Sequence, residues 1–249
     1  MCTLILLDRV VPGIPILVAA NRDEFLSRPA APPAVFRPGG LPAIAAPQDL
    51  EAGGTWMGVN AAGLFAGLTN RPAESRDERR RSRGLLVMDA LGSRDVAEVE
   101  AGLGGDPHRR YNPFFLLSAD GRRCSLASVS ETFTRVRALE PGVHVVGNED
   151  PSDPGSDKIS RIRSDAERKI DPQESFEALF AGLVEILGGH ELDSDPFRNT
   201  CVHTPDYGTR SAAVLALGPR ARGYWASEGP PCKTKFNDYT SLLDALPQA

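Results

Sequence analysis

The sequence predicts an α+β fold, in which two antiparallel sheets flanked by helices form a four-layer αββα sandwich over one domain, residues 1–249. Three observations favour this class. Blocks of strand-like and helix-like sequence alternate along the chain, as in two-sheet proteins with outer helices. The apolar, β-rich runs are joined by short turns, which is typical of antiparallel hairpins. No internal repeat or linker divides the chain, so we expect a single domain.

The first half of the chain contains two predicted hairpins. Residues 2–7 and 14–20 are apolar runs separated by a Pro-Gly turn signal. Residues 55–60 and 64–69 are joined by a tight turn that ends in glycine. Between the hairpins, residues 28–47 contain six prolines, and we expect an irregular surface excursion there.

The second half alternates helices with further strands. Apolar residues at helical spacing predict helices over residues 85–91, 96–103, 159–170 and 176–187. Ser82 and Ser93 are the expected N-caps of the first two. Strands are expected over residues 114–118, 124–129, 132–138, 143–146, 212–217 and 223–226. The tail from Pro230 is expected to drape over the surface.

Charge and hydropathy exclude several partners. The net charge of -5 and the pI near 5.5 argue against a nucleic-acid partner, which requires a basic face. The basic run Arg79–Arg81 with Arg83 alternates with acidic residues, so we interpret it first as a solvated face and second as an anion-binding patch. No run approaches the roughly 18 apolar residues of a spanning helix. The N-terminus lacks the features of a secretory signal, so we expect a cytoplasmic protein.

The four cysteines suggest neither a disulfide framework nor a metal site. They are far apart and form no C-x-x-C pair, which suits a reducing compartment. Cys201 and His203 offer two metal ligands, but the sequence shows no further pair at suitable spacing, so no metal is expected. No haem-attachment motif is present, and no cofactor is predicted.

Chemistry is predicted at the first hairpin. Its turn pairs Cys2 with about residue 20 or 21, which brings the segment Asn21–Glu24 beside Cys2. Removal of Met1 leaves Cys2 with both a thiol and an α-amine whose pKa of roughly 7.7 to 8.0 suits a general base. Asp23 is expected to orient the amine, and Arg22 to lower the thiol pKa.

Acyl chemistry at Cys2 also needs donors for an oxyanion. Asn70 and Asn148 follow predicted strands and offer side-chain amides for this purpose. From the residues alone, plainer interpretations stay open. Cys2 also suits a buried strand, Asn70 and Asn148 are ordinary turn residues, and Trp56 is typical of a core aromatic.

Several ordered motifs resemble the NRDE family, also called the transport and Golgi organisation protein 2 family. They cover residues 1 to about 226 and comprise the start Met1–Leu4, Asn21–Phe25, Gly53–Asn60, Gly63–Ala66, Leu68–Arg71, Ser82–Gly84, Asn112–Phe114, Gly147–Asn148 and Tyr207–Ser211. The family is similar to the N-terminal-nucleophile hydrolases, nearest to bile salt hydrolases and penicillin acylases. The resemblance therefore implies the four-layer fold named above.

The resemblance also implies roles for individual residues. Cys2 matches the nucleophile, Asp23 the residue that holds the amine, Asn70 an asparagine facing the nucleophile, Asn148 the oxyanion-hole asparagine and Arg210 the late arginine. Ala20 stands where the relatives have an early arginine, and Arg22 is instead expected to bind a ligand carboxylate or phosphate. The full set expected to bind ligand is Asn21, Arg22, Glu24, Trp56, Arg71 and Arg83.

Two functions from different classes remain. One is a Cys2-dependent hydrolase or acyltransferase acting on an amide or thioester of a small acylated substrate. The other is a binding or trafficking protein for acyl-coenzyme A, lipid or haem, linked by the resemblance to secretory and Golgi organisation. A purely structural scaffold is disfavoured because the motifs fall at strand ends, where sites form.

Overall fold

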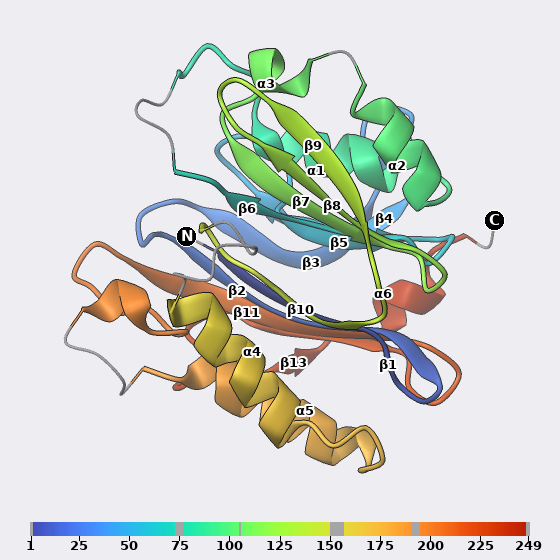
Figure 1. The fold of residues 1–249 in the computed structure, drawn as a ribbon, viewed down its shortest axis with the longest axis vertical. Helices are drawn as coiled ribbons and strands as arrows, with labels where there is room; N and C mark the ends of the chain where they lie inside the picture. Colours follow the sequence, from blue (N-terminus) through green and yellow to red (C-terminus); the bar gives the residue numbers. More distant parts are fainter. Residues whose placement is uncertain (1, 73–76, 105, 150–156, 191–194, 248–249) are drawn as a thin grey trace. The chain divides into compact units, whose positions relative to one another are not determined.

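The computed structural model describes residues 2–72, 77–104, 106–149, 157–190 and 195–247 of the protein. It divides into two compact units that are each discontinuous in sequence. The first comprises Met1–Arg28 and Pro141–Thr240, and the second comprises Pro29–Glu140 and Ser241–Ala249. Each unit contains one antiparallel sheet with helices, so the expected α+β class with two antiparallel sheets is confirmed (Figure 1). The single-domain expectation stays a prediction.

The first unit is built on a six-stranded sheet with the order β10-β1-β2-β11-β12-β13. Its strands are β1 Cys2–Val11, β2 Ile14–Phe25, β10 Gly142–Val146, β11 Tyr207–Leu217, β12 Gly223–Ser227 and β13 Asn237–Asp238. The hairpin of β1 and β2 turns at Pro12-Gly13, where Gly13 has a φ of 76°, a conformation that glycine adopts without strain. The predicted first hairpin is therefore confirmed.

Two long helices cover one face of this sheet. Helices α4 (Asp157–Lys169) and α5 (Phe176–Gly188) lie side by side against β1, β2, β10 and β11 (Figure 1). Alternate strand residues such as Ile5, Leu17 and Val214 bury against apolar residues of both helices. This packing follows from the period of two in a strand and of 3.6 in a helix. It brings the start of α4 and the end of α5 close to the Cys2 end of the sheet.

The second unit is built on a seven-stranded sheet with the order β3-β4-β5-β6-β7-β8-β9. The strands are β3 Ala30–Phe36, β4 Ile44–Asp49, β5 Met57–Asn60, β6 Phe65–Asn70, β7 Phe114–Ala119, β8 Cys124–Val129 and β9 Thr134–Leu139. The helices of this unit are α1 Arg83–Leu91, α2 Val96–Gly102, α3 Pro107–Arg110 and α6 Ser241–Asp244. Residues of α1 and α2 share a buried apolar cluster with β6 and β7.

The proline-rich stretch is not the irregular excursion that its composition predicts. It contains all of β3 and the start of β4. β3 is the first strand of its sheet, and the register shifts between Ala31 and Ala34, so Pro32 and Pro33 fall in an irregularity of an edge strand. Proline is tolerated at such positions because no ladder hydrogen bond is lost.

The predicted helices and most predicted strands are present within a few residues of their expected bounds, with differences at one cap and in the tail. Ser82 caps α1 by accepting a hydrogen bond from the Gly84 N–H, whereas the cap of α2 is Asp95 instead of Ser93. The tail from Pro230 is more ordered than expected, because it includes β13 and α6. Among the described residues, none of the helices is both long enough and apolar enough to cross a membrane.

Candidate active site at the Cys2 end of the first sheet

Strand pairing places Arg22 directly opposite Cys2, one or two residues beyond the expected partner. The turn lies at residues 12 and 13, which moves the pairing outward along β2. A bulge between Asp8 and Val11, where Arg9 has a φ of 54°, then takes up one residue of β1. The segment Asn21–Glu24 nevertheless lies beside Cys2, as the sequence predicts.

Asn148 reaches the same end of the sheet from the other side of β1. Leu4 pairs with Val146 on β10, and continuing this register by two residues brings Asn148 level with Cys2. Gly147 makes the close approach of α4 possible, since a Cβ added there would lie 2.6 Å from the Cδ1 of Ile159. Cys2 is thus flanked by Arg22 on one side and by Asn148 on the other.

Cys2 and Asn148 both line a pocket of about 150 Å³. Its other lining residues are Thr3, Gly147, Glu149, Lys158, Ile159, Asp195, Phe197 and Arg198. Lys158 stands in the first turn of α4, and its ammonium donates to the Phe197 carbonyl at 3.2 Å. Burial lowers the pKa of Lys158, against a raising influence of the Asp23 carboxylate and a further lowering by Arg161.

Lys158 is a site residue that the sequence interpretation missed. A signal was present, because a lysine in the first turn of a helix opposes the helix dipole and so suggests another partner for its charge. That partner is the negative charge of Asp23 on the neighbouring strand.

Thr209 holds the Asp23 side chain, and it is a second site residue, after Lys158, to which the sequence gave no role. Asp23 pairs with Thr209 across β2 and β11, and the Thr209 hydroxyl donates to Asp23 Oδ1 at 2.6 Å. The Tyr207 hydroxyl donates to the Asp23 carbonyl at 2.8 Å. Burial raises the pKa of the Asp23 carboxyl, while Lys158 and the Thr209 hydrogen bond act in the opposite direction.

Asn21 has a different setting from the one expected of a ligand-binding side chain. It is 1% exposed, and its Nδ2 donates to the carbonyls of Leu187 and Thr200, both at 2.9 Å. These bonds join the end of α5 and the segment before β11 to β2. Asn21 therefore supports the architecture of the site, and its ligand role stays a prediction.

The Cys2 thiol lies in an environment with opposing effects on its pKa. Burial raises the pKa above the ordinary value, and the negative charge of Asp23 adds to this. A hydrogen bond from the Asp23 backbone N–H and the positive charge of Arg22 lower it. The net direction is upward, so a thiolate at Cys2 requires a base that removes its proton.

Arg210 and Glu24 lie in the same unit as Cys2. The register between β11 and β2 shifts between Thr209 and Ser211, so Arg210 is the extra residue of a bulge, and its guanidinium donates to the Leu26 carbonyl. Glu24 accepts from the backbone N–H of Phe25 at 2.9 Å and lies 3.9 Å from Arg28. The roles expected for both residues stay predictions.

Four of the expected site residues belong to the second unit, and their roles as site residues stay predictions. Asn70 ends β6, and Trp56 precedes β5. The Arg71 guanidinium stacks over the rings of Phe115 and Phe133.

Arg83 starts α1 and donates to the Pro113 carbonyl at 2.8 Å. Within the neighbouring basic run, Arg79 pairs with Asp77 and Arg81 with Asp89.

Comparison with solved structures shows the fold. The penicillin V acylase of Agrobacterium tumefaciens superposes with a TM-score of 0.61 at 15% identity, over 97% of this chain and 87% of that one. An N-acylethanolamine-hydrolyzing acid amidase ortholog of Caenorhabditis elegans gives 0.57 at 14% identity, over 88% and 95%. A conjugated bile acid hydrolase of Clostridium perfringens gives 0.54 at 13% identity, over 97% and 93%. The expected N-terminal-nucleophile hydrolase-like fold is confirmed.

Comparison of sequences identifies the family. The chain is 28% identical over 229 residues to the Transport and Golgi organization protein 2 homolog of Bos taurus, covering 81% of this chain and 82% of that protein. The Homo sapiens homolog is 27% identical over 236 residues, with the same coverage. The model of the family described as "Transport and Golgi organisation 2" matches residues 1–224. This protein therefore belongs to the Transport and Golgi organisation 2 family.

Proposed function

We propose that the protein is an N-terminal cysteine hydrolase or acyltransferase that cleaves an amide or thioester of a small acylated substrate, after removal of Met1 makes Cys2 the first residue. The observation that carries this proposal is the convergence of Cys2, Asp23 and Asn148 at one end of the first sheet, beside a pocket. These are the nucleophile, the amine-orienting carboxylate and the oxyanion donor that the chemistry needs.

The reaction divides into acylation and deacylation. The α-amine of Cys2 takes the thiol proton, and the sulfur bonds to the acyl carbon while the carbonyl electrons move to oxygen. The Asn148 amide donates to this oxyanion. The C–N or C–S bond then breaks, and the ammonium proton passes to the leaving group. Water or an acceptor nucleophile attacks the resulting thioester, which releases the acyl product and restores the thiol.

The pocket supports a small substrate with a polar or charged part. Lys158 and Arg198 line it together with the acidic residues Glu149 and Asp195, so its wall is not purely apolar. The related structures are described as acting on penicillin V, N-acylethanolamines and conjugated bile acids, three kinds of acylated small molecule. These likenesses support N-acyl amides as the first compounds to test.

A non-catalytic binding protein for acyl-coenzyme A, lipid or haem is the second candidate. The raised pKa of the half-buried Cys2 thiol favours it, because a protonated thiol is a poor nucleophile. The two candidates differ in whether the α-amine is free to accept that proton. They are therefore separated by the state of the N-terminus and by covalent acylation.

Intact mass spectrometry tests both points on one sample. The purified protein is measured before and after incubation with a panel of acyl-coenzyme A thioesters and N-acyl amides. We expect loss of Met1 and an acyl adduct that Cys2→Ala abolishes. Asn148→Ala should slow adduct formation by about 10² to 10³, the usual effect of losing one oxyanion donor. Retained Met1 with no adduct, in a protein that still binds a panel compound, would favour the binding protein and reject the hydrolase.

A further inference from the structure

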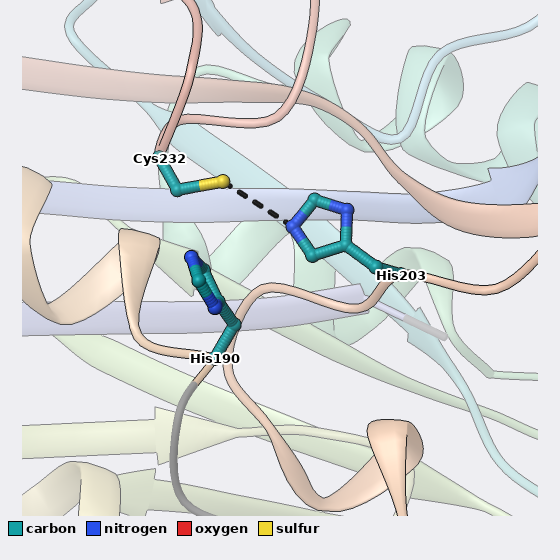
Figure 2. Close-up of side chains that lie close together, drawn as sticks. All are labelled: His190, His203 and Cys232. Carbon is teal, nitrogen blue, oxygen red and sulfur yellow. Dashed lines mark hydrogen bonds between the residues drawn. The ribbon is translucent and has the colours of Figure 1, made fainter.

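Four side chains that offer metal ligands lie close together in the first unit, next to the segment whose Thr200 carbonyl is bonded to Asn21. They are His190, Cys201, His203 and Cys232. Figure 2 shows His190, His203 and Cys232 directed toward a common space. One ligand atom of each of these three lies within 4.8 Å of the others. The fourth residue, Cys201, contacts both His203 and Cys232 through its sulfur.

The spacing of three of these atoms matches a tetrahedral zinc site. Bonds of about 2.3 Å to sulfur and 2.0–2.1 Å to nitrogen separate two sulfurs by about 3.8 Å, and a sulfur from a nitrogen by about 3.5 Å. The observed Cys201–Cys232 Sγ separation is 3.7 Å. The His203 Nε2 atom lies 3.4 Å from Cys201 Sγ and 3.2 Å from Cys232 Sγ.

His190 lies beside His203 and Cys232. Its ring centroid is 5.3 Å from that of His203, and the two ring planes are nearly perpendicular at 85°. Because its ligand atom lies within 4.8 Å of those of His203 and Cys232, a side-chain rotation that moves it by roughly an ångström reaches the S···N spacing of a zinc site, about 3.5 Å.

The backbone explains why these side chains meet. Cys201 and His203 are two residues apart, and their side chains meet, with Cys201 Sγ 3.4 Å from His203 Nε2. The Cys201 N–H donates to the Gly189 carbonyl at 2.8 Å, which fixes the residue next to His190. Cys232 lies in a turn that starts at Pro230.

The Cys232 turn packs against the end of α5, where a Cβ added at Gly188 would lie 3.5 Å from the Cys232 Cα, an ordinary contact distance. The Cys232 N–H also donates to the sulfur of Cys201. Sulfur ligands of metals commonly accept such second-sphere hydrogen bonds.

We propose that His190, Cys201, His203 and Cys232 bind one Zn²⁺ ion in a closed, structural Cys₂His₂ site. Four protein ligands leave no position for a catalytic water, which distinguishes a structural zinc site from a catalytic one. Mixed thiolate and imidazole ligands select zinc over hard cations such as Mg²⁺.

Two other chemistries of the same residues fit the geometry less well. A Cys201–Cys232 disulfide needs a sulfur separation of about 2.05 Å, well below the observed 3.7 Å. A Cys232–His203 nucleophile pair needs only one sulfur and one imidazole, and it leaves the second of each without a role. A bound cation uses all four.

The zinc site would stabilise the segments that hydrogen-bond to Asn21 and Asp23 of the candidate active site. The segment that carries Cys201 and His203 is bound to β11, since Thr209 Oγ1 accepts from the Val202 N–H at 2.8 Å. The same hydroxyl donates to Asp23. Asn21 holds the Thr200 carbonyl next to Cys201. The ion therefore fixes the residues that position Asn21 and Asp23.

Metal analysis of the purified full-length protein under reducing conditions is the first test. We expect one zinc per chain by elemental mass spectrometry, either as purified or after reconstitution with Zn²⁺. Replacement by Co²⁺ should give the visible absorption of tetrahedral cobalt and a thiolate-to-metal charge-transfer band, and Mg²⁺ should not compete. A chelator should lower the thermal unfolding midpoint, because the ion binds only the folded chain.

Two variants at accessible positions locate the ion. His203→Gln and Cys232→Ser should each weaken zinc binding by at least about 100-fold, because even outer-sphere changes cost 10- to 100-fold. Both should also remove the effect of the chelator on the unfolding midpoint. Cys2→Ala is the matched control, since it removes a thiol outside the cluster and should retain the zinc.

Two results would overturn the proposal. One is a reduced, folded protein that takes up no zinc. The other is zinc that stays bound with unchanged affinity in both His203→Gln and Cys232→Ser. Neither result bears on acylation of Cys2, so this test is independent of the proposed hydrolase activity.

Discussion

Replacing Asn21 by alanine is expected to lower the free energy of unfolding by about 3 kcal/mol. The Asn21 amide makes two buried hydrogen bonds, one to the Leu187 carbonyl and one to the Thr200 carbonyl. Each bond contributes about 1 kcal/mol, and each carbonyl left unpaired in a buried setting adds part of a desolvation cost of about 1–3 kcal/mol. The sum is about 2–4 kcal/mol. For a chain of this size, the central value of about 3 kcal/mol corresponds to a fall in Tm of roughly 6–12 °C.

The assay is urea unfolding followed by circular dichroism, with thermal unfolding as a second measurement. Asn21→Asp should destabilise more than Asn21→Ala, because a carboxylate directs oxygens toward two carbonyl oxygens and is itself buried. Glu24→Gln is the matched control from the same motif, since Glu24 is only half-buried, and its effect should stay within about 0.5 kcal/mol.

The reasoning would be refuted if Asn21→Ala unfolded within about 0.5 kcal/mol of the unmodified protein. If that variant also lost binding of an acyl compound, Asn21 would be a ligand contact, as the sequence predicts, and its two carbonyl partners would carry little energy. Loss of both stability and the acyl adduct would instead support a structural role for the two hydrogen bonds of the Asn21 amide.

Three further predictions concern protons and packing. Burial raises the Asp23 pKa, so the folded state binds the proton more tightly than the unfolded state does. Stability should therefore fall as pH rises from the ordinary carboxyl pKa of about 3.9 through the folded pKa. In urea unfolding at stepped pH, Asp23→Asn should flatten this part of the stability curve, and equal slopes for the two proteins would contradict the pKa shift. Alkylation of Cys2 by iodoacetamide should have a pH midpoint above that of an ordinary thiol, because the Cys2 pKa is raised. Arg22→Gln should move the midpoint higher, since the Arg22 charge lowers this pKa. A midpoint unchanged by that substitution would show that the Arg22 charge has no effect on the thiol pKa. Gly147→Ala should lower the free energy of unfolding, measured by thermal unfolding, by about 1–3 kcal/mol, because its Cβ meets Ile159 Cδ1. Ile159→Val, which removes that methyl group, should recover part of the loss in the double variant. Simple additivity of the two effects would argue against the clash.

Local features of the chain were predictable because each depends on residues close in sequence. The Pro12-Gly13 turn defined the first hairpin, and helical periodicity located α4 and α5 within a few residues. The position of the Asn21–Glu24 motif beside Cys2 also followed, since a hairpin brings its two ends together whatever the details of its turn.

Local rules failed where a neighbouring strand changed their meaning. Prolines in residues 28–47 predicted irregular backbone, but the edge of a sheet tolerates proline, and the composition does not reveal which strand is an edge. The exact partner of Cys2 depended on a bulge at Asp8–Val11, which no periodicity discloses.

What the sequence determined by itself is most of the strands and helices and the family motifs, because these depend on residues close together in the chain. What only the tertiary structure decided is which distant groups meet. Lys158 approaches Asp23 through the packing of α4, and Cys232 joins Cys201 and His203 through the order of the strands. Such encounters join segments separated by tens to more than a hundred residues, and their proximity is set by strand pairing and core packing, which leave no local periodic trace in the chain.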